Sequence, residues 1–493
     1  MFESAELGHK IDKETYEKEV PELRASLLNA QFDLAEDSSF PVIILAGGVD
    51  GAGKGDTVNL LNEWMDPRHI RAHAMGEPTP EEKDRPPMLR FWRALPPKGK
   101  IGIFFGSWYT DPIVNRVTGK TKTAELNQSI DEINRFEKML TDEGALIIKF
   151  WFHLSKKAQK KRLKALEKDP KTRWRVADTD WARFKIYDKF RKWSEYTLQE
   201  TSTDVASWIV VEGVNARYRN LTVGKILLEA LRKRLDQKDH AKAPVTTAPL
   251  NPRTDKLNIL RSLDMSKAYT KPVYKSELEE YQGRLNLLMR SPKFKKNFAL
   301  IIAYEGADAG GKGGNIRRVT AALDARFYNI IPVAAPTEEE RAQPYLWRFW
   351  RHVPAKGRVT IFDRTWYGRV LVERVEGFCS EADWRRAYGE INDFEEQLVH
   401  NNILVFKFWL AISNDEQLRR FKEREKIGFK RFKITEEDWR NREKWDDYEE
   451  AVCDMVDLTS TKIAPWTIVE GNSKYYARIK VLKTLCERVE AAL

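Results

Sequence analysis

Short apolar runs alternate with longer, charged stretches along the whole chain. The apolar runs have the length of buried strands, and the stretches between them are amphipathic, as surface helices are. Strands that alternate with helices predict βαβ units and a parallel sheet with helices on both faces. In such sheets, ligands bind at the carboxyl ends of the strands. The predicted strands are residues 42–45, 101–105, 146–148 and 208–211, then 299–302, 359–362, 404–406 and 466–469.

The pattern occurs twice, because residues 258 positions apart match along the chain. Lys54 matches Lys312 (312 − 54 = 258), and the same offset relates Trp108-Tyr109 to Trp366-Tyr367. A constant offset without insertions or deletions indicates a duplicated domain. The polar, proline-containing stretch between the copies lacks apolar periodicity and is predicted to be a linker. We therefore predict a first domain at residues 1–238, a linker at 239–256 and a second domain at 257–493.

The first strand of each copy runs into a glycine-rich loop that precedes a helix. In the second copy this loop is Gly306 to Gly313 and reads GADAGGKG, which fits the GxxxxGK pattern of a P-loop. Its glycines let backbone N–H groups point at phosphate oxygens, and Lys312 adds a positive charge. The Ser or Thr that usually follows the lysine and holds Mg²⁺ is Gly313 here, so the metal must rely on carboxylates. The phosphate-binding glycines are expected to be Gly306, Gly310, Gly311 and Gly313.

The next strand of the second copy ends in Asp363-Arg364. An apolar strand that ends in Asp beside a P-loop is the Walker B arrangement, so Asp363 and the loop residue Asp308 are the expected metal ligands. Arg364 is expected to neutralise charge on the transferring phosphoryl group. Downstream lie further charged residues that could serve the site or could form ion pairs on a helix surface. These are Arg369, Glu373 and Arg374.

The first copy keeps the loop but loses this charge. Phe105 and Gly106 replace Asp363 and Arg364. The first domain is therefore expected to be degenerate and inactive, and the second to be catalytic. Both copies then carry a basic stretch with helical spacing, which could be a solvated helix face or a lid that closes over phosphates. Its residues are Arg419, Arg420, Lys422, Arg424, Lys426, Lys430, Arg431 and Lys433 in the second copy, and Lys156, Lys157, Lys160, Lys161, Arg162 and Lys164 in the first.

Composition narrows the class of protein. The formal charge of +11 favours a polyanionic partner, which could be a nucleic acid, an anionic membrane or a phosphate-rich substrate. Three cysteines without a CxxC pair suggest neither a disulfide framework nor a zinc site, which fits a reduced, cytoplasmic location. No apolar run reaches the length of a membrane span, and the N-terminus has no signal-peptide pattern.

Taken together, these motifs resemble the polyphosphate kinase 2 family. The resemblance rests on EGADAGGKGG (305–314), PTEEE (336–340), IFDRTWYGRVLVERVEGF (361–378), EINDFE (390–395), KFWLAIS (407–413) and APWTIVEG (464–471). It implies a P-loop kinase fold with a helical lid and Mg²⁺-dependent phosphoryl exchange between inorganic polyphosphate and a nucleotide. Two fused domains resemble the branch that converts AMP to ADP.

The resemblance also implies roles for individual residues. Asp308 and Lys312 would act on phosphate, with Asp363 and Arg364 as the strand-end pair and Arg369 and Glu373 as further site residues. The residues that would contact the polyanion are Lys407, Arg420, Arg424 and Lys430. Thr337 and the glutamates after it could frame the acceptor pocket, or could simply begin a helix, because acidic residues favour a helix's first turn.

Three other functions remain open from the sequence. An ATP-dependent nucleoside monophosphate kinase would use the same fold, since fold alone does not separate donors. A polyphosphate kinase could act on nucleoside diphosphates instead. A binding module for nucleic acid or polyphosphate would need no turnover, and the first copy fits that description better than the second. The expected partners are polyphosphate and AMP or ADP, without nucleic acid or membrane; a homo-oligomer is compatible with the sequence.

Overall fold

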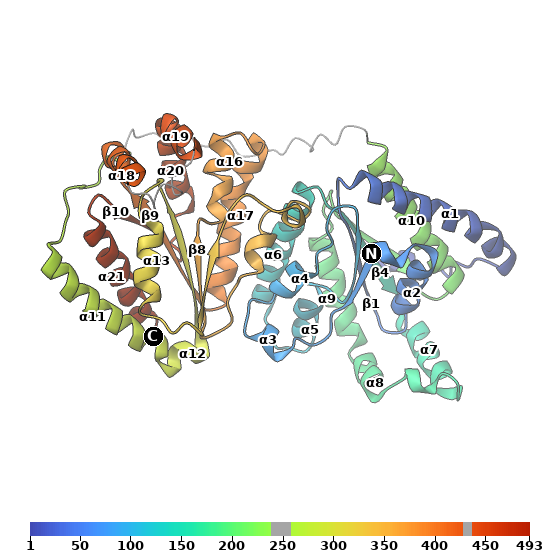
Figure 1. Ribbon diagram of the computed structural model, residues 1–493. Helices are drawn as coiled ribbons and strands as arrows, with labels where there is room; N and C mark the ends of the chain where they lie inside the picture. The colour runs from blue at the N-terminus through green and yellow to red at the C-terminus, as the bar shows by residue number, and fades with distance from the viewer. Residues whose placement is uncertain (238–257, 427–435) are drawn as a thin grey trace. The chain divides into compact units, whose positions relative to one another are not determined.

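The computed structural model describes residues 1–237, 258–426 and 436–493. The whole of the predicted linker, 239–256, and the predicted polyanion contact Lys430 therefore lie outside the described residues. The chain forms two compact units, each built on its own five-stranded sheet (Figure 1). The α/β architecture predicted from the apolar runs is confirmed.

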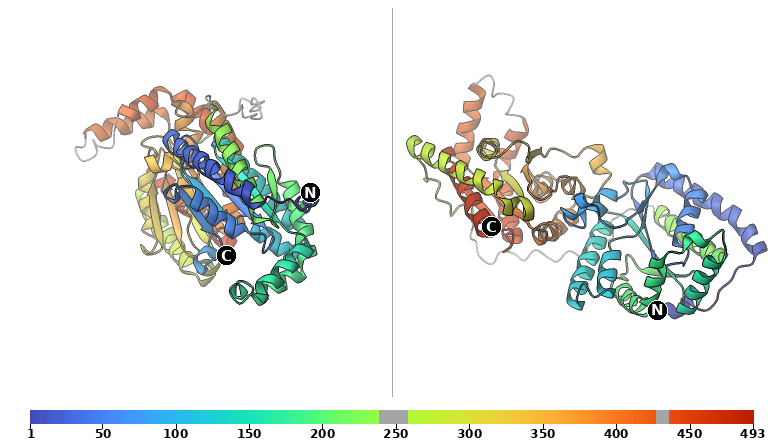
Figure 2. Two further views of the ribbon diagram at one scale, coloured as in Figure 1. Left: turned by 90° about the vertical axis from the view of Figure 1, so that its right-hand side faces the viewer. Right: turned by 90° about the horizontal axis from the view of Figure 1, so that it is seen from below.

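The sheet of the first unit has the order β2-β3-β1-β4-β5, and all of its paired strands are parallel. Each predicted strand is present, and a further one, β2 at the sheet edge, was not predicted. The strands are β1 Val42–Gly48, β2 Ile70–Ala74, β3 Ile101–Phe105, β4 Leu146–His153 and β5 Trp208–Glu212. The helices along the first copy of the sequence are α1 Lys13–Asp37, α2 Lys54–Trp64, α3 Pro80–Lys83, α4 Leu89–Ala94, α5 Thr110–Val117, α6 Thr123–Asp142, α7 Lys156–Lys168, α8 Asp178–Lys185, α9 Tyr187–Glu200 and α10 Ala216–Leu235. Figure 2 shows α1 and α10 packed side by side.

The sheet of the second unit repeats this order as β10-β9-β6-β8-β7. Its strands are β6 Ala299–Gly306, β7 Tyr328–Pro332, β8 Val359–Asp363, β9 Ile403–Ala411 and β10 Trp466–Glu470. The helices along the second copy of the sequence are α11 Lys271–Arg290, α12 Pro292–Asn297, α13 Lys312–Thr320, α14 Glu338–Arg341, α15 Trp347–Trp350, α16 Val372–Val375, α17 Glu381–His400, α18 Asn414–Lys426, α19 Glu436–Glu443, α20 Trp445–Thr459 and α21 Lys474–Ala492. In register, Tyr304 of β6 pairs with Asp363 of β8, and Glu305 pairs with Trp409 of β9. This places the loop after β6 between the ends of two other strands.

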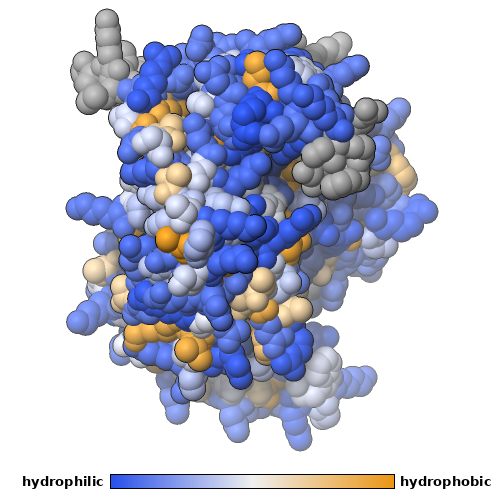
Figure 3. Space-filling model, turned by 60° about the vertical axis from the view of Figure 1, so that its left-hand side comes forward, coloured by the Kyte–Doolittle hydropathy of each residue, from blue (hydrophilic) through white to orange (hydrophobic). Residues whose placement is uncertain are grey.

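Helices cover both faces of the second sheet (Figure 1). One face carries α11, α13 and α21, and α17 with α20 lie on the other. The core under the first group is apolar and includes Leu300, Ile302, Ile361 and Leu482. The surface face in Figure 3 is mostly hydrophilic, with apolar residues scattered rather than gathered in one patch. Among the described helices, none is long and apolar enough to cross a membrane.

Candidate active site

The loop after β6 is shaped by glycines that no other residue could replace without a shift. Gly306 has φ +147°, and an added Cβ would lie 2.7 Å from the carbonyl oxygen of Leu410. Gly311 has φ +109° and is the residue before α13 begins at Lys312. The Lys312 Nζ donates to the Gly306 carbonyl at 2.7 Å, which folds the side chain back across the loop. The loop thus presents backbone N–H groups, a helix N-terminus and an ammonium group on one concave surface.

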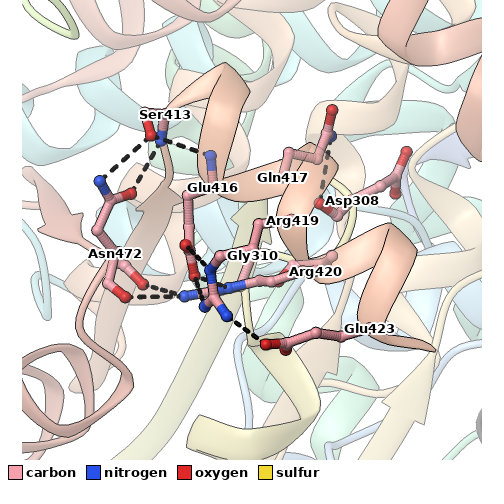
Figure 4. A network of polar contacts seen from close by, with 11 residues as sticks. Asp308, Gly310, Ser413, Glu416, Gln417, Arg419, Arg420, Glu423 and Asn472 are labelled. Carbon is pink, nitrogen blue, oxygen red and sulfur yellow. Dashed lines mark hydrogen bonds and ion pairs between the residues drawn. The ribbon is translucent and has the colours of Figure 1, made fainter. Parts of the chain in front are cut away.

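Arg420 supports this loop from α18, as Figure 4 shows. Its guanidinium donates to the carbonyls of Ala309 and Gly310 in the loop, and to those of Gly471 and Asn472 after β10. Its Nε donates to Glu416 at 2.6 Å. Arg420 was predicted to contact the polyanion. The residue is 2% exposed and its donors are occupied by protein acceptors, which fits a role in positioning the loop. It also lines the smaller of the two cavities beside the loop, so contact with a polyanion stays a prediction.

Asp308 and Arg364 meet at the mouth of the loop. The Arg364 Nη2 lies 3.5 Å from Asp308 Oδ1, and Asn441 Nδ2 of α19 donates to Asp308 Oδ2 at 2.9 Å. Burial lowers the pKa of Arg364, but attraction to Asp308 and Glu305 outweighs it and leaves that pKa raised. Arg364 also has φ +64°, in the left-handed region where a non-glycine residue is strained. A strained, firmly charged arginine at a strand end is typical of a functional site.

Glu305 is a site residue that the sequence interpretation did not single out. It is the next-to-last residue of β6 and is 6% exposed. Its Oε1 accepts from the backbone N–H of Thr365 at 2.7 Å and from the Thr365 hydroxyl at 2.8 Å, which fixes the turn that carries Arg364. Burial raises the pKa of Glu305, and Lys312 opposes that shift. The sequence did contain a signal for Glu305. The matching residue of the first copy is Gly47, so the carboxylate is present only in the copy that also has Asp363 and Arg364.

Asp363 ends β8 as predicted, and its backbone carbonyl accepts from the N–H of Val333 at 3.0 Å. The described residues contain no group of three or more His, Cys, Asp or Glu side chains that could hold a metal ion. Mg²⁺ does not need such a cage, because it usually binds one or two carboxylates together with waters and substrate phosphates. Asp308 and Asp363 provide that kind of donor set.

A cavity of about 410 Å³ opens on one side of the loop. Its polar floor is made of Glu305, Asp308, Lys312 and Arg364, and its walls are mainly apolar. The apolar residues come from the segment before α11, from the region after β8, and from β9 and α20. They include Leu260, Leu263, Met265, Leu371, Val372, Trp409, Ile412, Trp445 and Val452. The volume and the lining suit a small aromatic ligand that carries phosphate.

A second cavity, of about 210 Å³, lies against other residues of the same loop. Ala309, Gly310 and Gly311 line it, together with four basic residues: Arg420 and Arg424 of α18, and Lys474 and Arg478 of α21. The predicted polyanion contact Arg424 therefore does lie beside the loop. The same loop borders an apolar cavity and a basic one.

Lys407 was predicted to contact a polyanion, and the structure contradicts this. Its side chain is fully buried in the middle of β9, where Nζ donates to Glu395, to the Tyr367 hydroxyl and to the Thr459 carbonyl. The first unit builds the same network around Lys149, with the matching ion pair to Glu137 also at 2.7 Å. A cluster that is retained in the copy without Asp363 belongs to the fold rather than to the chemistry.

Four other predicted residues do not line the first cavity. Arg369 and Glu373 form an ion pair with each other at 3.2 Å. Arg374 donates to Asp454 at 2.7 Å and so joins α16 to α20. The Thr337 hydroxyl accepts from the N–H of Glu340 at the start of α14, while Glu340 accepts from the N–H of Thr337. For each of these, the structure favours the interpretation as an ion pair or helix cap over that of a pocket residue.

In the first unit, side chains occupy the positions of both cavities. Phe2, which matches Leu260, is 1% exposed and stacks on Trp151 and His153. Arg219 is also 1% exposed, and its guanidinium donates to the Ala52 carbonyl and the Thr57 hydroxyl beside the loop. In the second unit the residue at the position of Arg219 is Ala477, which lines the basic cavity. The first unit thus keeps the loop and fills the space around it.

Comparisons with known proteins agree with this duplicated architecture. The family profile described as polyphosphate kinase 2 matches residues 10–239 and 268–493. A polyphosphate:AMP phosphotransferase of Pseudomonas aeruginosa is 60% identical over 492 residues, which cover 100% of this chain and 99% of that protein. One of Acinetobacter johnsonii is 38% identical over 476 residues, covering 95% and 96%. A crystal structure assigned as polyphosphate kinase 2 from Pseudomonas aeruginosa has a TM-score of 0.90 at 57% identity and covers 100% of this chain and 99% of that chain. The chain therefore belongs to the polyphosphate kinase 2 family, as its motifs predicted.

Proposed function

We propose that this protein transfers a phosphoryl group from inorganic polyphosphate to a nucleoside monophosphate, AMP, and that the second unit carries the reaction. The observation that carries this proposal is the position of the phosphate-binding loop between an apolar cavity and a basic one. The apolar cavity, with Trp409 and Trp445, suits a nucleoside. The basic cavity, with Arg424, Lys474 and Arg478, suits a donor made only of phosphate.

The reaction breaks the P–O bond that joins the terminal phosphate to the polyphosphate chain and forms a P–O bond to a phosphate oxygen of AMP. The products are ADP and a polyphosphate shorter by one phosphate. An acceptor phosphate is already ionised, so the site needs no strong general base. Phosphoryl transfer depends instead on positioning and on neutralising charge, which the loop N–H groups, Lys312 and Arg364 supply.

Mg²⁺ is the cofactor we propose. Asp308 and Asp363 would hold it together with substrate phosphates, and the ion would neutralise charge on the phosphates. Asp308 is well placed for this role because Asn441 and Arg364 fix its two oxygens at the edge of the cavity. Glu305 would act through the turn that it holds, and Arg420 through the loop that it braces.

The choice of AMP rests on two kinds of support. The relatives that match this chain over its full length are named polyphosphate:AMP phosphotransferases. A GDP-polyphosphate phosphotransferase of Mycobacterium tuberculosis is 36% identical but matches only 45% of this chain. An AMP acceptor therefore agrees with the two-unit architecture, whereas the relative named for GDP matches less than half of this chain.

The test is an initial-rate assay of the purified chain with Mg²⁺ and long-chain polyphosphate, in which ADP formed from AMP is compared with ATP formed from ADP. We expect AMP to be the better acceptor at matched concentrations. A clear preference for ADP would refute the choice of acceptor but not of donor. Turnover of AMP with ATP and none with polyphosphate would refute the donor and would identify a nucleoside monophosphate kinase.

A further inference from the structure

The two units differ sharply in the charge of the segment that follows the fourth strand. In the first unit, residues 156–189 contain 13 Lys and Arg against 5 Asp and Glu, a formal charge of +8. The matching residues of the second unit, 414–447, contain 11 against 10, a formal charge of +1. The basic segment predicted as a phosphate-binding lid is thus concentrated on the unit that lacks Asp363 and Arg364.

The difference arises from acidic partners that α7 lacks. In α18, Glu416 and Glu423 form ion pairs with Arg419. The residues of α7 that match these two glutamates are Ala158 and Ala165. The exposed lysines of α7 follow one another at helical spacing: Lys157, Lys160, Lys161 and Lys164. Within the described parts of the chain, none of these four forms an ion pair. A row of unpaired like charges is unfavourable for the free helix and favours a polyanionic ligand.

The basic helix is joined directly to the phosphate loop of the first unit. Gln159 of α7 donates to the Asp50 carbonyl at 3.0 Å, and Arg162 lies 3.9 Å from Asp56 at the start of α2. Arg183 of α8 lies 3.5 Å from Asp50. Figure 1 shows α7 and α8 projecting away from the sheet of the first unit, so that one long side of each faces solvent. The surface is therefore both open and continuous with a loop of phosphate-binding shape.

We propose that this surface, defined as the exposed face of α7 with Arg162 and Arg183, binds the polyphosphate chain without turnover. The proposal rests on the proposed function, which makes polyphosphate the donor. Phe2 and Arg219 fill the space around the first unit's loop, so the ligand binds on the outside of the unit and its nucleotide cavity plays no part. A long chain held there stays near the enzyme between turnovers, which raises its effective concentration.

The chemistry of α7 favours polyphosphate over nucleic acid. Proteins that bind single-stranded nucleic acid combine basic grooves with aromatic side chains on which bases stack. The sequence of α7, KKAQKKRLKALEK, contains no aromatic residue. The exposed Trp174 lies beyond the end of α7, where its ring packs under the guanidinium of Arg175. Lysine ammonium groups bind phosphates as point charges and need no base contact. A ligand made of phosphates alone satisfies this surface.

The test replaces four lysines together in the full chain, as Lys157→Gln, Lys160→Gln, Lys161→Gln and Lys164→Gln. A matched control removes the same charge from exposed lysines elsewhere in the first unit, as Lys10→Gln, Lys18→Gln, Lys120→Gln and Lys233→Gln. Both variants and the wild type are assayed with AMP and either long-chain polyphosphate or tripolyphosphate. Equilibrium binding of long-chain polyphosphate and of single-stranded DNA is measured separately, because binding does not depend on turnover.

We expect the α7 variant to raise KM for long-chain polyphosphate roughly tenfold and to bind that polymer with a weaker salt dependence. Its kcat, and its KM for tripolyphosphate, should stay at the wild-type values, as should every constant of the control. An α7 variant indistinguishable from the control would overturn the proposal. So would an equal loss in both variants, or lost DNA binding with unchanged polyphosphate binding. A wild type that turns over no polyphosphate would refute the proposed function, and the binding measurement would still decide the role of α7.

Discussion

Arg364→Gly should inactivate the protein and leave it more stable than Arg364→Ala. Arg364 has φ +64°, and the matching residue of the first unit is Gly106, with φ +81°. The left-handed conformation costs an L-residue roughly 1–2 kcal/mol, and glycine adopts it freely. Glycine in turn loses about 0.5–1 kcal/mol more backbone entropy on folding. The glycine variant should therefore be more stable than the alanine variant by about 1 kcal/mol.

The expected loss of activity follows from removing the Arg364 side chain. Arg364 is 47% exposed and lies 3.5 Å from Asp308, so the ion pair itself contributes at most about 1 kcal/mol to folding. Its expected role is to neutralise charge on the transferring phosphoryl group. Both variants should therefore lose activity by about 100-fold or more, measured as kcat/KM for AMP with polyphosphate.

The assay combines steady-state kinetics with thermal unfolding. For a domain of this size, about 1 kcal/mol corresponds to a shift of roughly 2–4 °C in Tm. Asn402→Gly is the control for the backbone effect, because Asn402 has φ +58° at a turn before β9, and Gly144 matches it in the first unit. That variant should keep full activity and should not lose stability. Activity within about tenfold of wild type in Arg364→Gly, or equal Tm values for the glycine and alanine variants, would refute the reasoning.

Three further predictions separate chemistry from fold. Lys312→Ala should lower kcat/KM by about 100-fold or more, whereas Lys54→Ala should retain most turnover; equal losses in the polyphosphate assay would contradict the assignment of catalysis to the second unit. Lys407→Ala and Lys149→Ala should each destabilise their unit by about 3–5 kcal/mol in urea unfolding, because each leaves a buried glutamate unpaired. Burial raises the pKa of Glu305, so the folded state resists ionisation of this carboxyl and the wild type loses stability as pH rises above about 4.5. The free energy of unfolding of Glu305→Gln should therefore increase relative to wild type over that range, and a difference that does not change with pH would contradict this.

The sequence predicted the sheet well because its strands are apolar on both faces. Runs such as residues 299–302 and 404–406 are apolar throughout, which is enough to predict a buried strand. The duplication supported each predicted strand by repeating its apolar run in the other copy. The edge strand β2 was missed, because IRAHA alternates polar and small residues and most of it is exposed. An edge strand needs little burial, so periodicity does not distinguish it from a loop.

Site residues were harder to predict because a charged side chain has the same appearance in a motif whether it faces a ligand or the core. Lys407 lies in a motif that carries the family resemblance, and Arg420 lies in the basic stretch that follows it. Lys407 nevertheless pairs with Glu395 inside the sheet, and Arg420 braces the loop. Their burial depends on helices far away in the sequence. Arg424, one helical turn beyond Arg420, lines the same basic cavity as Arg420 does. The orientation of neighbouring residues on α18 depends on tertiary packing that no local pattern contains.

The duplicated chain separates the residues that the fold needs from those that the reaction needs. Lys149 and Lys407 are kept in both units, make the same contacts and are buried. Glu305 is charged in the second unit alone, lies beside the loop and lines the cavity. Arg219 supports the loop of the first unit in a similar way, because it donates to the Ala52 carbonyl. In the second unit Arg420 donates to the matching carbonyl, that of Gly310. The first unit thus preserves the shape of the loop by a different route, which indicates that the loop is needed as a structural element even where Asp363 and Arg364 have no counterpart.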